Sequence, residues 1–142
     1  MLCHLICLLN FYNVLFADEY TTIIQTHDSK NAGTDDDITI QYIGSETLNT
    51  TKVFMLDLDD YNDFETNKTD IYEHFDKSIG AIKRAKLCKV GFSRDWWVEK
   101  VSVRVYDEQS YEYFSAEFDP RSFIMTKGCT LLDVFDDTQC KA

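Results

Sequence analysis

The chain has 142 residues, of which 44% are hydrophobic, and its formal net charge is −11. This length fits one domain rather than two, and the 14% of aromatic residues exclude an intrinsically disordered chain. The 14 Lys and Arg residues form no cluster and are outnumbered by 25 Asp and Glu residues, which excludes a nucleic-acid partner.

The first 17 residues differ in composition from the rest. Residues 1–17 contain no Asp, Glu, Lys or Arg, and their apolar run is too short to span a bilayer. We interpret them as a secretory signal peptide cleaved after Ala17. A buried N-terminal strand is the alternative. The prediction is a secreted, extracellular chain with one domain over residues 18–142 and no transmembrane segment.

Two Asn-x-Thr triplets support passage through the secretory route. They begin at Asn49 and Asn67, and each is an acceptor for N-glycosylation, so the chain is predicted to be a glycoprotein.

Cysteine counting predicts one disulfide. Cys3 and Cys7 leave with the signal peptide, and Cys88, Cys129 and Cys140 remain. In an oxidising compartment three cysteines favour one bond and one leftover thiol. We favour Cys129–Cys140, which would tie down the C-terminal segment, with Cys88 as a buried apolar residue. The other pairings stay open.

Hydrophobic residues alternate with period two, which is typical of strands. Strands are predicted over residues 20–27, 37–43, 52–58, 70–75, 85–90, 97–106, 112–118 and 130–135. In the sixth, Trp97, Val101, Val103 and Val105 are expected to share one face, with Glu99 as its polar exception. About eight strands at this spacing predict an all-β sandwich or barrel.

Four segments in order carry a family resemblance. Residues 20–28 are followed by Ala-Gly-Thr-Asp at 32–35 and by an alternating strand that ends at Gly44. The second segment consists of Asn-Asp-Phe at 62–64 and Asp-Ile-Tyr at 70–72. The third is Ile-Gly-Ala-Ile at 79–82, and the fourth is Asp-Trp-Trp-Val-Glu-Lys-Val-Ser-Val at 95–103. Together they resemble the PLAT domain of lipoxygenases, pancreatic-type lipases, polycystins and clostridial alpha-toxin. The resemblance implies an eight-stranded antiparallel β-sandwich. Residues 88–92 depart from the family pattern.

Three turns carry candidate calcium ligands. They are the turn around Gly33, the turn around Asp63 and the turn before Trp96. In a sandwich these turns are expected to lie at one end. Ca²⁺ takes six to eight hard oxygen ligands. The PLAT resemblance implies ligands at Asn31, Gly33, Asp35, Asn62, Asp63 and Asp95. The alternative is a solvated acidic rim that binds no metal. We assign Asp36 and Asp37 to that rim.

Three aromatic residues near the third turn are candidates for facing a membrane. They are Phe92, Trp96 and Trp97. Adjacent side chains in a strand point to opposite faces, so one Trp is expected in the core and the other outside. The alternative is that both Trp residues pack inside.

No catalytic constellation is visible. His27 and His74 have no metal-ligand spacing, and there is no Gly-x-Ser-x-Gly motif. We therefore expect a non-enzymatic module that binds lipid or membrane surfaces with the help of Ca²⁺. The alternatives are a calcium-independent protein-recognition module or effector, and a detached accessory domain of a lipase-like enzyme.

Overall fold

The computed structural model describes residues 17–45 and 48–135. Nearly all of the predicted signal peptide, and Cys140, lie outside these ranges. The regular elements of the described residues are nine strands: β1 (Asp18–Thr26), β2 (Asp37–Gly44), β3 (Phe54–Met55), β4 (Thr69–Asp76), β5 (Ile82–Val90), β6 (Trp96–Asp107), β7 (Glu112–Glu117), β8 (Phe123–Met125) and β9 (Gly128–Asp133). No described helix is long and apolar enough to cross a membrane.

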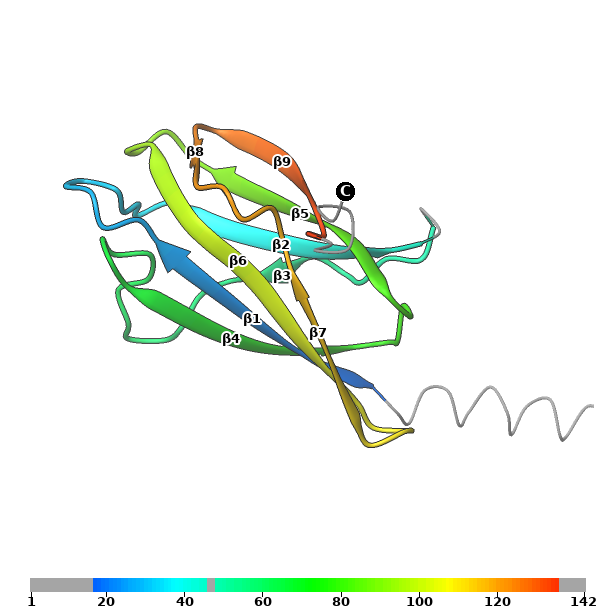
Figure 1. The fold of residues 1–142 in the computed structure, drawn as a ribbon. Coiled ribbons are helices and arrows are strands. Elements are labelled where there is room, and N and C mark those ends of the chain that lie inside the picture. The colour runs from blue at the N-terminus through cyan, green and yellow to red at the C-terminus, as the bar shows by residue number, and fades with distance from the viewer. Residues whose placement is uncertain (1–16, 46–47, 136–142) are drawn as a thin grey trace, which may run out of the picture.

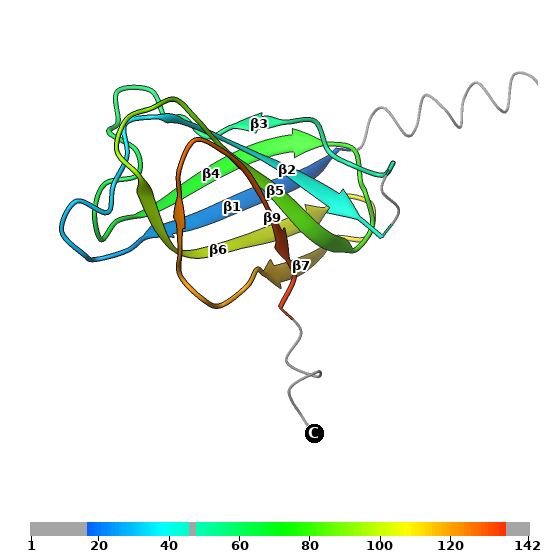
Figure 2. The ribbon, with the colours of Figure 1, turned by 90° about the horizontal axis from the view of Figure 1, so that it is seen from above.

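The strands form two antiparallel sheets packed face to face (Figures 1 and 2). The five-stranded sheet has the order β4-β1-β6-β7, and β8 pairs with the start of β6. The four-stranded sheet has the order β3-β2-β5-β9. The predicted all-β sandwich is confirmed. The additional strand, β8, has only three residues and was too short to show in the alternation.

Alternating burial builds the core between the sheets. β1 buries every second residue, and Thr22, Ile24 and Thr26 are fully buried. Tyr20 stacks on Tyr42 across the two sheets, with ring centroids 5.7 Å apart. The period-two pattern of the sequence thus matches one fully buried face of this strand.

A β-bulge changes which tryptophan is buried. β6 has one extra residue, Glu99, opposite the step from Gln25 to Thr26 in β1. An extra residue shifts the alternation by one, so Trp96 lies in the core and Trp97 turns away from it. The prediction that Trp97 shares a face with Val101, Val103 and Val105 was wrong for this reason.

The disulfide joins Cys88 to Cys129. The two cysteines lie directly opposite each other where β5 pairs with β9, and their Cα atoms are 4.0 Å apart. The predicted Cys129–Cys140 pair and the buried apolar role of Cys88 were therefore wrong. The pairing of two strands that are far apart in the chain brings these residues together, and sequence spacing does not show it.

We predict that this bond stabilises the sandwich by attaching the edge strand β9. Replacing both residues (Cys88→Ser with Cys129→Ser) should lower the free energy of unfolding by about 2–4 kcal/mol in urea denaturation, because the bond closes a long loop in the unfolded chain. Cys140→Ser is the control and should leave stability unchanged. A non-reducing peptide map that links Cys129 to Cys140 would contradict the prediction.

Candidate functional site

Three loops lie together at one end of the sandwich, the left-hand end in Figure 1. They are residues 27–36, 56–68 and 91–95, and β1, β3 and β5 lead into them. The backbone N–H of Thr34 donates to the carbonyl oxygen of Phe64 at 3.1 Å and joins the first loop to the second. The expected meeting of the three turns is therefore present.

Phe64 holds the second loop in place. Its buried ring meets Trp96 edge to face, with centroids 4.9 Å apart, and its N–H donates to the buried carboxylate of Asp70 at 3.0 Å. Its φ of 58° reverses the chain direction just before Glu65. The loop is thus anchored through one core aromatic residue.

Gly33 lies where the first loop passes closest to the second. A Cβ atom at this position would lie 2.6 Å from the carbonyl oxygen of Phe64, closer than non-bonded atoms approach. Only glycine therefore allows the two loops to come this near.

A buried ion pair joins the first loop to β5, the strand that leads into the third loop. The side chain of Lys89 is 1% exposed, and its Nζ contacts the carboxylate of Asp36. Asp36 also accepts from the N–H of Ser93 at 3.2 Å. The hydrogen bond from Lys89, helped by Ser93, holds the pKa of Asp36 below its usual value. The assignment of Asp36 to a solvated rim was therefore wrong.

The loop pocket, about 570 Å³ in volume, opens between the three loops. It is lined by Asn31, Gly33, Thr34, Asp35, Asn62, Glu65, Thr66, Ser93 and Arg94. Four of the six predicted ligands are in this lining. Glu65 is a fifth oxygen donor that sequence analysis missed. The left-handed turn at Phe64 brings it back beside Asn62, whose Nδ2 donates to its carboxylate at 2.7 Å.

The remaining two predicted ligands lie elsewhere. Asp63 accepts from the hydroxyl of Tyr72 at 2.7 Å and from the N–H of Leu58 at 3.3 Å. It lines a smaller neighbouring pocket of about 190 Å³. Asp95 is exposed and is not among the residues that line either pocket. The three predicted turns meet, but not every acid in them points to the same place.

The donor atoms of the loop pocket fit the chemistry of calcium. Asp35 and Glu65 supply carboxylates, Asn62 an amide oxygen, and the backbone at Gly33 a carbonyl, all hard oxygen donors. No three His, Cys, Asp or Glu side chains of the described residues are grouped to hold a metal. A calcium ion here would therefore depend on amide and backbone oxygens as well.

Arg94 lies in the same pocket and opposes a cation there. Its Nη1 donates to the Oδ1 of Asn31 at 3.0 Å, so the oxygen of this predicted ligand is already engaged. The guanidinium adds a positive charge to a lining that also holds Asp35 and Glu65. Calcium binding through Asn31 requires Arg94 to move away.

The three aromatic candidates have different environments. Phe92 is 85% exposed at the end of the third loop. Trp97 is half-buried and stacks on His27, with centroids 3.8 Å apart. Trp96 is fully buried, so its proposed membrane-facing role was wrong.

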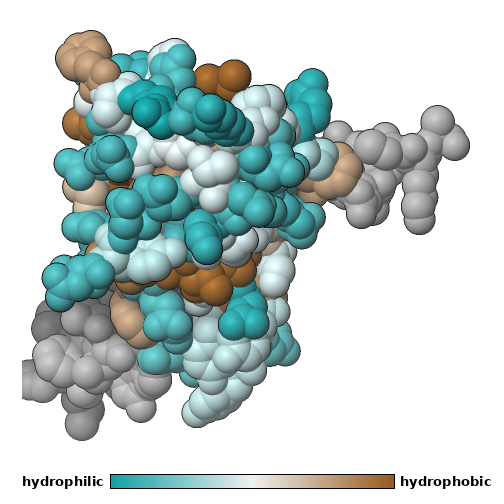
Figure 3. Space-filling model, turned by 90° about the vertical axis from the view of Figure 1, so that its left-hand side faces the viewer, coloured by the Kyte–Doolittle hydropathy of each residue, from teal (hydrophilic) through white to brown (hydrophobic). Residues whose placement is uncertain are grey.

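Figure 3 looks onto the loop end of the molecule. Hydrophilic residues cover most of this face, and hydrophobic residues form small separate areas. Leu58, Tyr61 and Phe92 are exposed apolar residues of the loops. The face is thus a polar surface with isolated apolar side chains.

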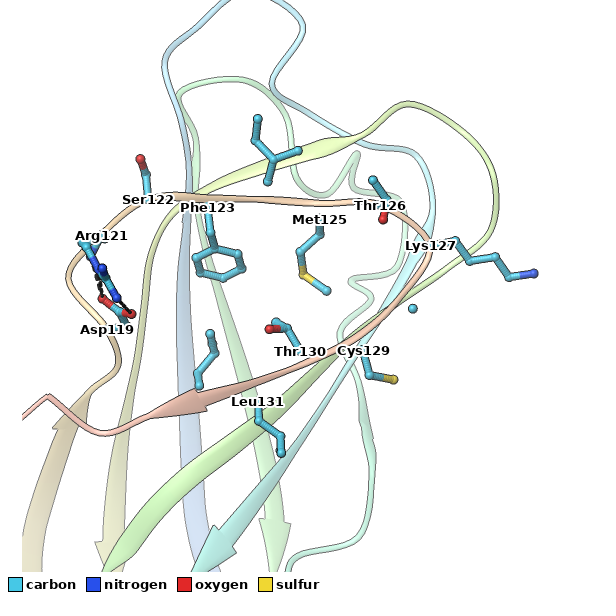
Figure 4. Close-up of a pocket in the computed structure, with 13 residues that line it drawn as sticks. Asp119, Arg121, Ser122, Phe123, Met125, Thr126, Lys127, Cys129, Thr130 and Leu131 are labelled. Carbon is cyan, nitrogen blue, oxygen red and sulfur yellow. Dashed lines mark hydrogen bonds and ion pairs between the residues drawn. The ribbon is translucent and has the colours of Figure 1, made fainter.

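Another pocket, about 460 Å³ in volume, separates β8 from β9 (Figure 4). Phe123 and Met125 point into it from β8, whereas Lys127 points away. The ion pair of Arg121 with Asp119, 3.0 Å long, lies at its edge. None of the predicted calcium ligands or membrane-facing residues lines this pocket.

The fold and the loops define a class of protein: an antiparallel two-sheet sandwich with a cluster of oxygen donors at one end. The sequence matches the PLAT/LH2 domain family over residues 20–118. The chain belongs to this family. No curated protein matches it in sequence.

Solved structures of other proteins contain a domain with the same fold. Coral 8R-lipoxygenase, described as activated by calcium through a C2-like domain, is 26% identical with a TM-score of 0.66, over 83% of this chain. A calcium-dependent 11R-lipoxygenase is 28% identical with a TM-score of 0.64, over 82% of this chain. The chain spans 17% of each lipoxygenase. Clostridium absonum alpha-toxin, 20% identical with a TM-score of 0.64, shares the fold; the match covers 84% of this chain and 32% of the toxin.

We predict that the pair of Asp36 with Lys89 is required for stability. Asp36→Asn should lower the free energy of unfolding by about 3 kcal/mol, because it leaves the buried ammonium without its counter-charge. The pKa of Asp36 is lowered on folding, so its contribution is complete above the ordinary carboxyl pKa of about 3.9 and is lost as the pH falls below it.

Thermal unfolding from pH 3 to pH 7 measures both the loss of stability in Asp36→Asn and its dependence on pH. The stability difference between the natural protein and Asp36→Asn should shrink as the pH falls toward 3. Asp59→Asn, in an exposed part of the second loop, is the matched control. Equal melting temperatures for Asp36→Asn and Asp59→Asn at pH 7 would contradict the prediction.

Proposed function

We propose that this chain is a secreted, non-catalytic module that binds lipid surfaces with the help of calcium. The observation that carries the proposal is the loop pocket, whose lining includes Asp35, Asn62 and Glu65 from two of the loops. Phe92 belongs to the same loop as Ser93, which lines that pocket, and is exposed. An ion and an apolar side chain would thus act from one end of the molecule.

Electrostatics explains why calcium would be needed. A chain with a net charge of −11 is repelled by anionic lipid headgroups. A divalent ion between Asp35 and Glu65 removes the repulsion at the loop end and presents positive charge to lipid phosphate. Phe92 then enters the interface, where burial of an aromatic ring is favourable.

Two relatives support this proposal. The descriptions of the 8R- and 11R-lipoxygenase structures attribute calcium activation or regulation to those enzymes, and the first places it in a C2-like domain. Family membership makes the same use of calcium by this chain a reasonable inference.

Calcium titration of the protein is the first test. Asp35→Asn and Glu65→Gln should each weaken calcium binding on the order of tenfold, because affinity in such sites follows the charge of the ligands. Arg94→Gln should strengthen it, since it frees Asn31 and removes a competing positive charge. Isothermal titration calorimetry measures all three.

Asp59→Asn is the control for this titration, because it removes one loop carboxylate that does not line the loop pocket. Its affinity should equal that of the natural protein. Equal effects of Asp59→Asn and Asp35→Asn would indicate a diffuse acidic rim rather than a site.

Liposome co-sedimentation tests the lipid-binding function. Protein recovered from the medium of eukaryotic cells should begin at Asp18, carry N-glycans, and sediment with phosphatidylserine-containing vesicles in calcium but not in chelator. Asn67 is exposed, and the half-buried Asn49 donates from Nδ2 to the carbonyl oxygen of Ile79 at 2.8 Å, so Asn67 is the more accessible acceptor.

Phe92→Ser should lower the partition into these vesicles at least about tenfold, since burying a Phe side chain is worth about 1.5–3 kcal/mol and each 1.4 kcal/mol is a factor of about ten. Leu48→Ser is the control, because Leu48 is an exposed apolar residue of a loop at the opposite end. Sedimentation that ignores calcium, or capture of a protein partner in chelator without any vesicle binding, would favour a protein-recognition module instead.

A further inference from the structure

Phe92 is kept exposed by both of its neighbours in the third loop. A Cβ atom at Gly91 would lie 2.5 Å from the Oδ1 of Asp36, and the φ of 132° at this position is one that glycine adopts readily. On the other side, the N–H of Ser93 donates to the same carboxylate at 3.2 Å. Asp36 is itself fixed by the buried Lys89. The backbone on either side of the ring is therefore anchored to a buried ion pair.

The turn between β8 and β9 brings Lys127 onto this ring. In the ladder between β5 and β9, Gly128 lies opposite Lys89, and the disulfide joins the next pair of residues. This register places the turn beside the start of the third loop. The Nζ of Lys127 lies 3.8 Å from the centroid of the Phe92 ring, a distance at which an aromatic face attracts a cation.

Lys127 carries a positive charge that no carboxylate neutralises. None of the ion pairs formed by the described residues includes it. Its side chain is exposed and points away from the pocket between β8 and β9 (Figure 4). The two segments that meet here, residues 90–93 and 126–128, contain no Asp or Glu. An ammonium on an exposed ring is thus a local cationic site on a chain with a net charge of −11.

We propose that Phe92 and Lys127 form a docking unit for an anionic phospholipid. This inference deepens the proposed lipid-binding function and rests on it, because it names the class of lipid and the side chains that select it. The Phe92 ring enters the interface, and the ammonium of Lys127, carried to the level of the headgroups, donates to an oxygen of the lipid phosphate. Neither side chain lines the loop pocket, so this contact uses none of the oxygen atoms proposed for calcium.

The charge of the docking unit selects among lipids. A zwitterionic phospholipid carries its own ammonium group beside the phosphate, whereas an anionic one has a net negative charge that complements Lys127. One lysine near an anionic surface raises affinity about fivefold. That gain is too small to overcome the repulsion of the whole chain from a charged vesicle, so sedimentation still needs calcium. Binding of a soluble short-chain lipid does not.

NMR titration of the natural protein in chelator tests the docking unit directly. The probes are monomeric dihexanoyl-phosphatidylglycerol, dihexanoyl-phosphatidylcholine and inorganic phosphate. The phosphatidylglycerol should shift the amide signals of Phe92, Ser93 and Gly128 and bind about fivefold more tightly than the phosphatidylcholine. Phosphate alone should not bind, because it has no acyl chain to bury against the ring.

Variants separate the charge of Lys127 from charge in general. Lys127→Gln should lower the affinity for phosphatidylglycerol about fivefold, to the level of phosphatidylcholine, and Lys127→Arg should retain it. Lys86→Gln removes the same charge from an exposed position in the middle of β5 and is the matched control. Phe92→Ser should weaken the binding of both lipids.

Three outcomes overturn the proposal: equal affinity for the two lipids, equal losses in Lys127→Gln and Lys86→Gln, or phosphate that binds as tightly as phosphatidylglycerol. The calcium site is judged separately. Lipid binding through Lys127 by a protein that binds no calcium would support the docking unit and contradict only the proposed role of calcium. Calcium-dependent sedimentation that Lys127→Gln leaves unchanged would contradict only the docking unit.

Discussion

The loop end depends on one packing arrangement, the insertion of Phe64 into the core against Trp96. The backbone of the same residue donates to Asp70 and accepts from Thr34, so a single buried ring sets both the path of its own loop and its distance from the first loop. Gly33 is the complementary requirement, because any side chain there would collide with the Phe64 carbonyl. A loop fixed by core packing keeps its oxygen donors in position without a metal.

Charge is arranged in two layers at this end. Beneath the surface, Lys89 neutralises Asp36 and leaves that carboxylate a structural role. In the loop pocket, Asp35 and Glu65 share the lining with Arg94, which provides a positive charge of the protein's own. The acidic loops can therefore lie close together with limited repulsion. In the proposed function, calcium and Arg94 compete for the same oxygen atoms, and the calcium affinity reflects that competition.

Features that depend on neighbouring residues could be predicted from the sequence, whereas features that depend on the pairing of distant strands could not. The positions of most strands followed from alternation, since each strand with one buried face shows its period in a few residues. The sequence did not show that Trp97 leaves the face of Val101, because the bulge at Glu99 appears only when β6 is paired with β1. The disulfide also depends on strand pairing. Cys88 and Cys129 meet through the β5–β9 register, whereas proximity in the chain favoured Cys140.

The sequence by itself determined the fold class, the family and the meeting of three polar turns at one end, because strand periodicity and motif order are properties of neighbouring residues. Only the tertiary structure decided which oxygen atoms share a pocket. The turn at Phe64 directs Glu65 toward Asn62, while Asp63 is taken up by Tyr72 and Leu58. Side-chain direction in a loop depends on the core contacts beneath it, and those contacts join residues that are distant along the chain.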